Sequence, residues 1–339
     1  MSIQAAAYTT LNPSFMEPEL LIQYSQASGF LDTLAGEEMR VRIAEDDLLV
    51  YQRQINLRTK VSAGQSSGQQ ELPGVDIMAS MMSTPTYMIK TRAQWDHHDV
   101  AAAARWGFAA PEAYRLGLRQ ANFQFARDAV LHGISPDNGE GLLNAQGATA
   151  LNLPPDTNGN DTVQTYDNGE MAFFLSTQIL NIKTRTRQLG MGRKFTIIGP
   201  QRTLGLFEYN VVQLVQFQRE GAGSASTKET LANIVQGNGD TIIWSYDDTL
   251  EGAGDGGSDA VIIVMTEVEK PSMEGIDTNV FGGLLPGSKV CTTAYCDMAA
   301  PREIISPLPA GATDMVMEWR ISSGWAPRPT AVTIVSMPY

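Results

Sequence analysis

The chain has 339 residues, of which 43% are hydrophobic and 18% are charged, and its formal net charge is −13. This composition is ordinary for a globular protein, and the length allows two modest domains or one domain with large excursions. The acidic balance argues against a broad nucleic-acid-binding face, because phosphate contacts need clustered lysine and arginine. No run approaches about 18 uninterrupted apolar residues, so we expect no membrane-spanning helix.

The two cysteines, Cys291 and Cys296, are few for a secreted protein stapled by disulfides, so a reducing interior is expected. Two thiols alone do not fill a zinc coordination sphere. They are interpreted as small buried residues, with a redox pair as the alternative. The first residues have no basic start and no long apolar run, so we expect no signal peptide.

In chain order, residues 1–47 are predicted to form an N-terminal arm and residues 48–93 an extended hairpin. Apolar and β-branched residues alternate with polar ones in the first half of the hairpin, at Ile55, Leu57, Thr59 and Val61. The tip, 62–70, is rich in Gly, Ser and Gln. Because an isolated hairpin is marginal in water, we expect a neighbouring subunit to cover it.

Two helices are predicted next, over 96–108 and 111–132. Pro111 suits a first helical position, and Gly133 suits the stop. The second helix is about 30 Å long and is predicted to be the spine of the molecule. Its apolar face is predicted from a recurrence at steps of three and four, in Tyr114, Leu118, Ala121, Phe125 and Ala129, with Arg115 and Arg119 away from that stripe.

The polar segment 151–166 is predicted to be a linker into a second region. That region is expected to alternate helices and strands, which indicates an α/β or α+β layout. The predicted helices are 169–189 and 201–212, and the predicted strands are 194–199, 241–246 and 259–266. Two closing strands, 315–322 and 328–337, are predicted around a turn.

Two glycine- or acid-rich loops formally match ligand motifs. The glycines of the loop 247–259 fit G-x-G-x-x-G, but a β-branched run follows where a helix is required, and the loop is acidic. It is interpreted as a flexible loop. The segment 156–167 loosely resembles a calcium loop, but Asp161 occupies the position that needs glycine. A plain surface loop is the favoured interpretation.

His97 and His98 are adjacent on a predicted helix and point to different sides, so they are interpreted as solvated residues beside a capping Asp96. The only other histidine is His132. No motif of a serine hydrolase, a zinc protease or a phosphate-binding loop occurs. We therefore expect no catalytic residue, no cofactor and no metal, and we keep a soluble α/β enzyme with an acidic site as the least favoured alternative.

Several segments, taken in order, resemble the major capsid proteins of tailed bacteriophages, which have the HK-97-like fold. The first is the order of arm, long hairpin and spine helix. The second is the passage after the spine with its sequence Gly141, Leu142, Leu143 and Asn144. The third is the helix 169–189 followed by the strand 194–199 and another helix, and the fourth is the closing strand within 328–335.

The resemblance implies an α+β fold with an N-terminal arm (1–47), an extended hairpin loop (48–93) and two domains. The peripheral domain, 94–165, contains the spine helix and takes in part of the C-terminal strands. The axial domain and closing strands occupy 166–339, where the acidic loop suits an axial position. The resemblance also implies hexamers and pentamers in an icosahedral shell that encloses double-stranded phage DNA without sequence-specific binding.

In this family the hairpin of one subunit lies over the spine region of a neighbour. The candidate contact residues are Ile55, Leu57, Lys60 and Gly64 on the hairpin, and Arg115 and Arg119 on the spine. The implied partners are a portal and decoration or scaffolding proteins, without a membrane. The implied location is the virion, after assembly in the host bacterial cytoplasm. A cellular encapsulating shell of the same fold is the main alternative.

Overall fold

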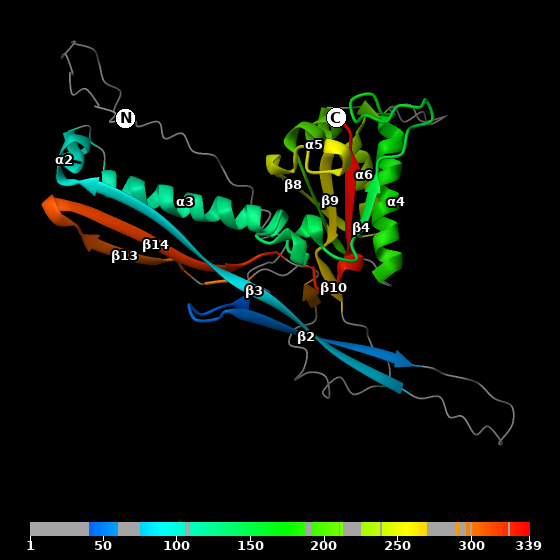
Figure 1. The fold of residues 1–339 in the computed structure, drawn as a ribbon. Coiled ribbons are helices and arrows are strands. Elements are labelled where there is room, and N and C mark those ends of the chain that lie inside the picture. The colour runs from blue at the N-terminus through cyan, green and yellow to red at the C-terminus, as the bar shows by residue number, and fades with distance from the viewer. Residues whose placement is uncertain are drawn as a thin grey trace, which may run out of the picture.

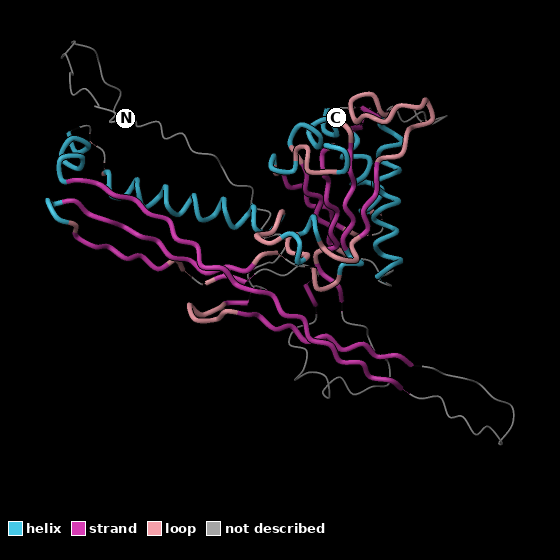
Figure 2. Tube along the Cα trace, viewed as in Figure 1, coloured by secondary structure: helices cyan, strands magenta, loops and turns pink. Residues whose placement is uncertain are grey.

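The computed structural model describes residues 41–59, 75–105, 107, 109–186, 192–209, 211–212, 225–237, 239–269, 289–291, 296–298, 300–324 and 326–339. The described part has an α+β architecture with two lobes and a projecting hairpin (Figure 1). We call the lobe built along the long helix α3 the peripheral lobe, and the lobe built on the sheet β4-β15-β9-β5-β8 the axial lobe. Long strands dominate the first lobe, and helices flank the sheet of the second (Figure 2).

The peripheral lobe is a twisted sheet of long strands against which α3 packs. Its strand order is β1-β12-β14-β3-β2, and β13 also pairs with β14. The helices are α2 (His97–Arg105) and α3 (Ala110–Leu131). The strands are β1 (Val41–Arg42), β2 (Leu49–Thr59), β3 (Val75–Asp96), β12 (Cys296–Asp297), β13 (Arg302–Pro307) and β14 (Ala312–Ser322).

The axial lobe has a mixed five-stranded sheet, in which β9 pairs antiparallel with both β15 and β5. Its strands are β4 (Thr149–Asn152), β5 (Lys194–Gly199), β8 (Thr241–Tyr246), β9 (Asp259–Met265) and β15 (Val332–Met337). Its helices are α4 (Asn168–Thr186), α5 (Gln201–Tyr209) and α6 (Thr227–Gln236). Two short pairs complete the described strands: β6 (Val211–Val212) with β7 (Ala225–Ser226), and β10 (Glu267–Glu269) with β11 (Lys289–Cys291).

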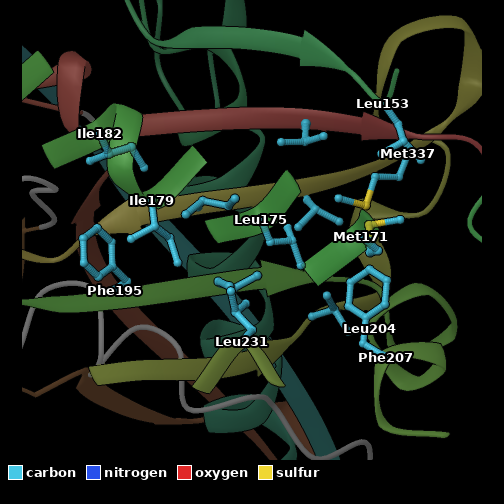
Figure 3. Packing of buried hydrophobic residues seen from close by; sticks show 14 of the residues in the cluster. Leu153, Met171, Leu175, Ile179, Ile182, Phe195, Leu204, Phe207, Leu231 and Met337 are labelled. Atoms are coloured by element: carbon cyan, nitrogen blue, oxygen red, sulfur yellow. The ribbon is translucent and has the colours of Figure 1, made fainter. Parts of the chain in front are cut away.

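The strand β9 is buried on both faces and separates two hydrophobic cores. Alternate residues of a strand point to opposite faces. Val261, Ile263 and Met265 pack with α4, α5 and α6 in one core, part of which is drawn in Figure 3. Ala260, Ile262 and Val264 pack with the end of α3 and with β14 in the other. This second core therefore joins the two lobes.

Local signals explain both ends of α3 and the start of α6. Pro111 lies in the first turn of α3, and Gly133, with φ +79°, follows its end. The helix α6, which our sequence analysis missed, begins with a capping box: Ser226 accepts from the Glu229 backbone N–H, and the Glu229 carboxylate accepts from the Ser226 N–H. The S-x-x-E spacing was a signal that could have found it.

Two boundaries predicted in the second half of the chain were wrong. The predicted linker 151–166 overlaps β4, which pairs parallel with β15 in the axial sheet. The helix predicted over 201–212 ends at Tyr209, before β6. The two predicted closing strands are confirmed as β14 and β15, which lie in different sheets, β14 in the peripheral sheet and β15 in the axial sheet. The strands predicted at 194–199 and 241–246 are confirmed as β5 and β8.

We predict that Gly324→Ala destabilises the subunit strongly. A Cβ on Gly324 would lie 2.5 Å from the backbone oxygen of Val130, so α3 and the segment after β14 would have to separate. We expect a loss of at least about 2 kcal/mol in urea denaturation followed by circular dichroism. Gly117→Ala on α3 is the matched control, because its Cβ would meet nothing within 4 Å. That variant should be neutral or gain up to about 1 kcal/mol. Equal stability of the two variants would contradict the proposed close approach.

Candidate assembly interface

The hairpin and the body share one continuous strand. Residues 75–85 of β3 pair antiparallel with β2, and residues 86–96 pair antiparallel with β14. The second half of β3 is therefore held in the peripheral sheet, while the first half extends with β2 beyond it (Figure 1). This arrangement gives the hairpin a rigid root. The predicted hairpin boundary at residue 93 falls inside β3, so the division into domains stays a prediction.

Large apolar side chains at the root of the hairpin lie in solvent. Leu48 is 68% exposed, Tyr51 58% and Met81 65%. Ile55 and Leu57, two predicted contact residues, lie in β2 opposite Ala79 and Ile77. Lys60 and Gly64, and the predicted tip 62–70, lie outside the described residues. The first 40 residues of the predicted arm also lie outside them.

The buried face of the spine helix is rotated from the predicted one: Leu118 and Ala129 are buried as expected, but Tyr114, Ala121 and Phe125 are not. Its buried face is centred on Leu118, Asn122, Ala126 and Ala129, at helical steps of four and three. Tyr114 and Phe125 of the predicted stripe are about 40% exposed. The prediction placed the aromatic residues Tyr114 and Phe125 on the buried face. The helix α3 instead packs close to β3 and β14, and small side chains allow that approach. Asn122 has no apolar signal, yet its Oδ1 accepts from the Thr91 hydroxyl of β3.

Partly exposed apolar residues form two rows on the flanks of α3. Leu116 and Phe123 are separated by about two turns, and Tyr114 and Phe125 by about three, so each pair shares a row. The ring of Tyr114 stacks on Trp95 of β3 at 5.5 Å. Leu116, Phe123 and Phe125 are each more than a third exposed. An apolar surface of this kind, on a long helix, is suited to contact with another protein surface.

The two candidate arginines of the spine form ion pairs within the subunit. Arg115 binds Glu303 of β13 through Nε at 3.0 Å and also Glu112 one turn earlier at 2.7 Å. Arg119 reaches the second oxygen of Glu303 at 3.1 Å. Because these groups lie at the surface, the pairs contribute little to stability. They orient α3 on β13, and a role in contact with a neighbouring subunit stays a prediction.

After the spine helix, the chain makes a close backbone crossing in the turn that follows α3. A Cβ on Gly141 would lie 2.5 Å from Gly133 N, and Gly141, with φ +86°, donates its backbone N–H to Gly324 O at 2.8 Å. The side-chain amide of Asn144 donates to the backbone oxygens of His132, at 2.8 Å, and Glu140, at 3.1 Å. The Gly-Leu-Leu-Asn sequence is therefore the connection that turns the chain after α3.

The carboxylate of Glu140 is the polar centre of this crossing. It is buried and accepts from the Tyr87 hydroxyl, the Ser323 hydroxyl and the Ser135 backbone N–H. Burial of Tyr87 and its hydrogen bond to the Glu140 carboxylate raise the pKa of Tyr87 to about 12. Strand β3, the end of β14 and the turn after α3 are thus joined through one side chain. Nothing in the sequence singled out Glu140.

The acidic loop 247–259 was expected to be flexible, but it is anchored at both ends. Asp247 forms an ion pair with Arg127 of α3 at 3.0 Å, and Asp259 is bound in a bidentate way by Arg202 of α5. Leu250 is fully buried in the core shared by the lobes. The strand β9 follows the loop, so the arrangement required for a dinucleotide motif is absent from it.

The structure also bears on the loop 156–167 and on the cysteines, which the sequence offered as candidate ligands. The Asp156 carboxylate accepts backbone N–H groups of Asn158, Asn160 and Asp167, which supports the interpretation of a plain loop. Cys296 is a buried free thiol, and burial raises its pKa to about 12. Its side chain fits the interpretation of a small buried residue. The side chain of Cys291 lies outside the described residues.

The fold is that of phage capsid subunits, as comparison with solved structures confirms. The capsid of Myoviridae phage XM1 matches with a TM-score of 0.67, 10% identity, and 98% of this chain and 100% of that chain covered. Mycobacterium phage Adephagia matches with a TM-score of 0.58, 10% identity, and 100% and 99% covered. The capsid of cyanophage P-SCSP1u matches with a TM-score of 0.57, 11% identity, and 96% and 92% covered.

The sequence itself also matches a family. The family described as major capsid protein matches residues 62–274, which is more than half of the chain. The chain therefore belongs to the major capsid protein family, as the resemblance to tailed-phage capsid proteins predicted. It is a structural component of a virion that assembles with its own copies into a capsid. No curated protein matches the sequence. Within the described residues, no helix is long and apolar enough to cross a membrane.

We predict that Asp259 contributes to stability in a pH-dependent way. Burial alone would raise its pKa, but Arg202, the Thr203 hydroxyl and the Gly252 N–H donate to the carboxylate and hold the pKa below its usual value. Because the folded pKa is lowered, this stabilisation is present above the unfolded pKa, near about 4, and is lost as pH falls through the folded pKa. Asp259→Asn should cost about 2 kcal/mol at pH 7, and less below pH 4.

Asp161→Asn, at an exposed position, is the matched control and should be neutral at both pH values. The measurement is urea denaturation at a series of pH values. A loss in Asp259→Asn that stays constant from pH 7 to pH 3 would show that the ionisation of Asp259 is not its source.

Proposed function

We propose that the protein builds an icosahedral shell from hexamers and pentamers around double-stranded DNA, with the hairpin of one subunit lying on the spine of its neighbour. The subunit acts through its surfaces and without catalytic activity. Its assembly takes place in the host bacterial cytoplasm. The hairpin residues Ile55, Leu57, Lys60 and Gly64 and the spine residues Arg115 and Arg119 are assigned to the region of this contact.

The observation that carries the proposal is the presence of exposed apolar side chains on both the hairpin root and the spine helix. The hairpin is a two-stranded ribbon, and such ribbons are marginally stable in water unless something packs on them. Its root exposes Tyr51 and Met81, while the spine exposes Leu116 and Phe123 on one flank. A closed shell brings these elements together because every copy supplies both. Heterologous contacts of this kind form rings when the rotation between copies closes.

The charge of the chain supports a container more than a DNA-binding protein. A formal net charge of −13 disfavours wide contact with phosphates, so DNA enclosed by the shell is held by confinement and not by affinity. A portal through which DNA enters, and scaffolding or decoration proteins, are the partners that such a shell requires or accepts. Particles that carry protein cargo and no nucleic acid would instead identify a cellular encapsulating shell.

We predict that charge on the spine flank blocks assembly while the subunit stays folded. Phe123→Glu places a carboxylate on the exposed flank, where desolvation of the charge opposes burial by a neighbour. Met81→Glu does the same at the hairpin root. Each change should raise the concentration needed for assembly at least about tenfold, measured by light scattering and negative-stain images. Their effect on the unfolding free energy should stay within about 0.5 kcal/mol, as for other exposed positions.

The controls keep the apolar character: Phe123→Leu and Met81→Leu should assemble at nearly the parent concentration. If both glutamate variants assemble as the parent does, neither the flank of α3 nor the hairpin root lies in the contact. If instead they fail to fold, these side chains belong to an intramolecular core.

A further inference from the structure

A cluster of polar side chains lies where β3 passes into α2, at the end of the peripheral lobe farthest from the axial sheet (Figure 1). It consists of Asp96, the last residue of β3, and His97 and His98, the first residues of α2. One ligand atom from each of the three lies within 4.8 Å of the other two. We propose that these three residues bind one first-row transition-metal ion of the Zn²⁺ class.

The sequence argued that His97 and His98 point to different sides, but in the structure their rings lie together. Adjacent histidines in a regular helix point to different sides, but the two imidazole rings here lie with centroids 3.9 Å apart and a tilt of 40°. This arrangement arises at the first turn, where the Asp96 carboxylate accepts the His97 backbone N–H at 2.6 Å and the Asp99 carboxylate accepts the Asp96 N–H at 3.1 Å. One ligand atom of each ring lies within 4.8 Å of an Asp96 carboxylate oxygen.

The distances fit a metal after small rotations. Ligand atoms on a tetrahedral zinc ion are about 3.4 Å apart, given bonds of about 2.1 Å. The His97 Nδ1 and Asp96 Oδ1 atoms are 2.6 Å apart and must open by about 1 Å, and no separation in the cluster must close by more than about 1.4 Å. The His97 and Asp96 side chains are 59% and 42% exposed, so little packing opposes these rotations.

The turn between β13 and β14 lies close to the first imidazole. Gly311, with φ +81°, lies in this turn, and a Cβ on it would approach His97 Nδ1 to 3.0 Å. Two imidazoles and one carboxylate make a donor set that suits Zn²⁺, Co²⁺ or Ni²⁺ better than Mg²⁺, which prefers oxygen. Water completes the coordination sphere.

The test is a titration of the full-length chain, produced without a histidine tag and freed of metal with a chelator. Co²⁺ binding is followed by its visible absorption, and Zn²⁺ is then added in competition. We expect one Co²⁺ per chain, displaced by Zn²⁺ and not by excess Mg²⁺. His97→Ala, His98→Ala and Asp96→Asn should each lower the affinity at least about tenfold.

His132→Ala is the matched control, because it removes the remaining histidine of the chain and should leave the affinity unchanged. Circular dichroism checks that each variant is folded. Binding that survives the double change His97→Ala with His98→Ala would overturn the proposal. So would an equal loss in His132→Ala, or no saturable Co²⁺ binding at all. These outcomes do not depend on whether the subunit assembles, so they are separate from the test of the shell.

Discussion

The burial of β9 on both faces is the constraint on which the rest of the subunit depends. All seven of its residues are fully buried, and its alternating side chains enter two separate cores. At about 25 cal/mol per Å² of apolar surface, such a strand is among the most stabilising parts of the chain. Because one of the two cores contains Ala126, Val130 and Leu131 of α3, the axial sheet also holds the spine. The two lobes therefore share one of their cores.

Buried charges reinforce that connection. Arg127 of the spine pairs with Asp247, and Arg202 of α5 pairs with Asp259, so both ends of one loop are bound to different helices. Inside the axial lobe, Lys183 of α4 pairs with Asp240, both nearly fully buried. Removing one partner of a buried pair costs more than the pair contributes, since it leaves an uncompensated charge. These pairs therefore favour one arrangement of the helices over alternatives.

Some parts of the subunit project from this body or lie at its surface. The first half of β3 and its partner β2 extend beyond the peripheral sheet, and the flanks of α3 keep aromatic residues at the surface. Both features are costly for a solitary subunit and are useful for one that is surrounded by copies of itself. The proposed contact between hairpin and spine would explain why these parts lie outside the body in a chain of the major capsid protein family.

The sequence by itself determined the succession of hairpin and spine helix, the strands β5 and β8, the limits of α3 and the family, because periodicity, proline, glycine and short motifs are local signals. Tertiary structure decided the rest. Which face of α3 is buried depended on how closely it approaches β3, so small residues and Asn122 replaced the expected Tyr114 and Phe125. The roles of Glu140, the anchored acidic loop and the convergence of Asp96, His97 and His98 arise from packing between distant segments or from the geometry of one helix start. Spacing along the chain does not carry that information.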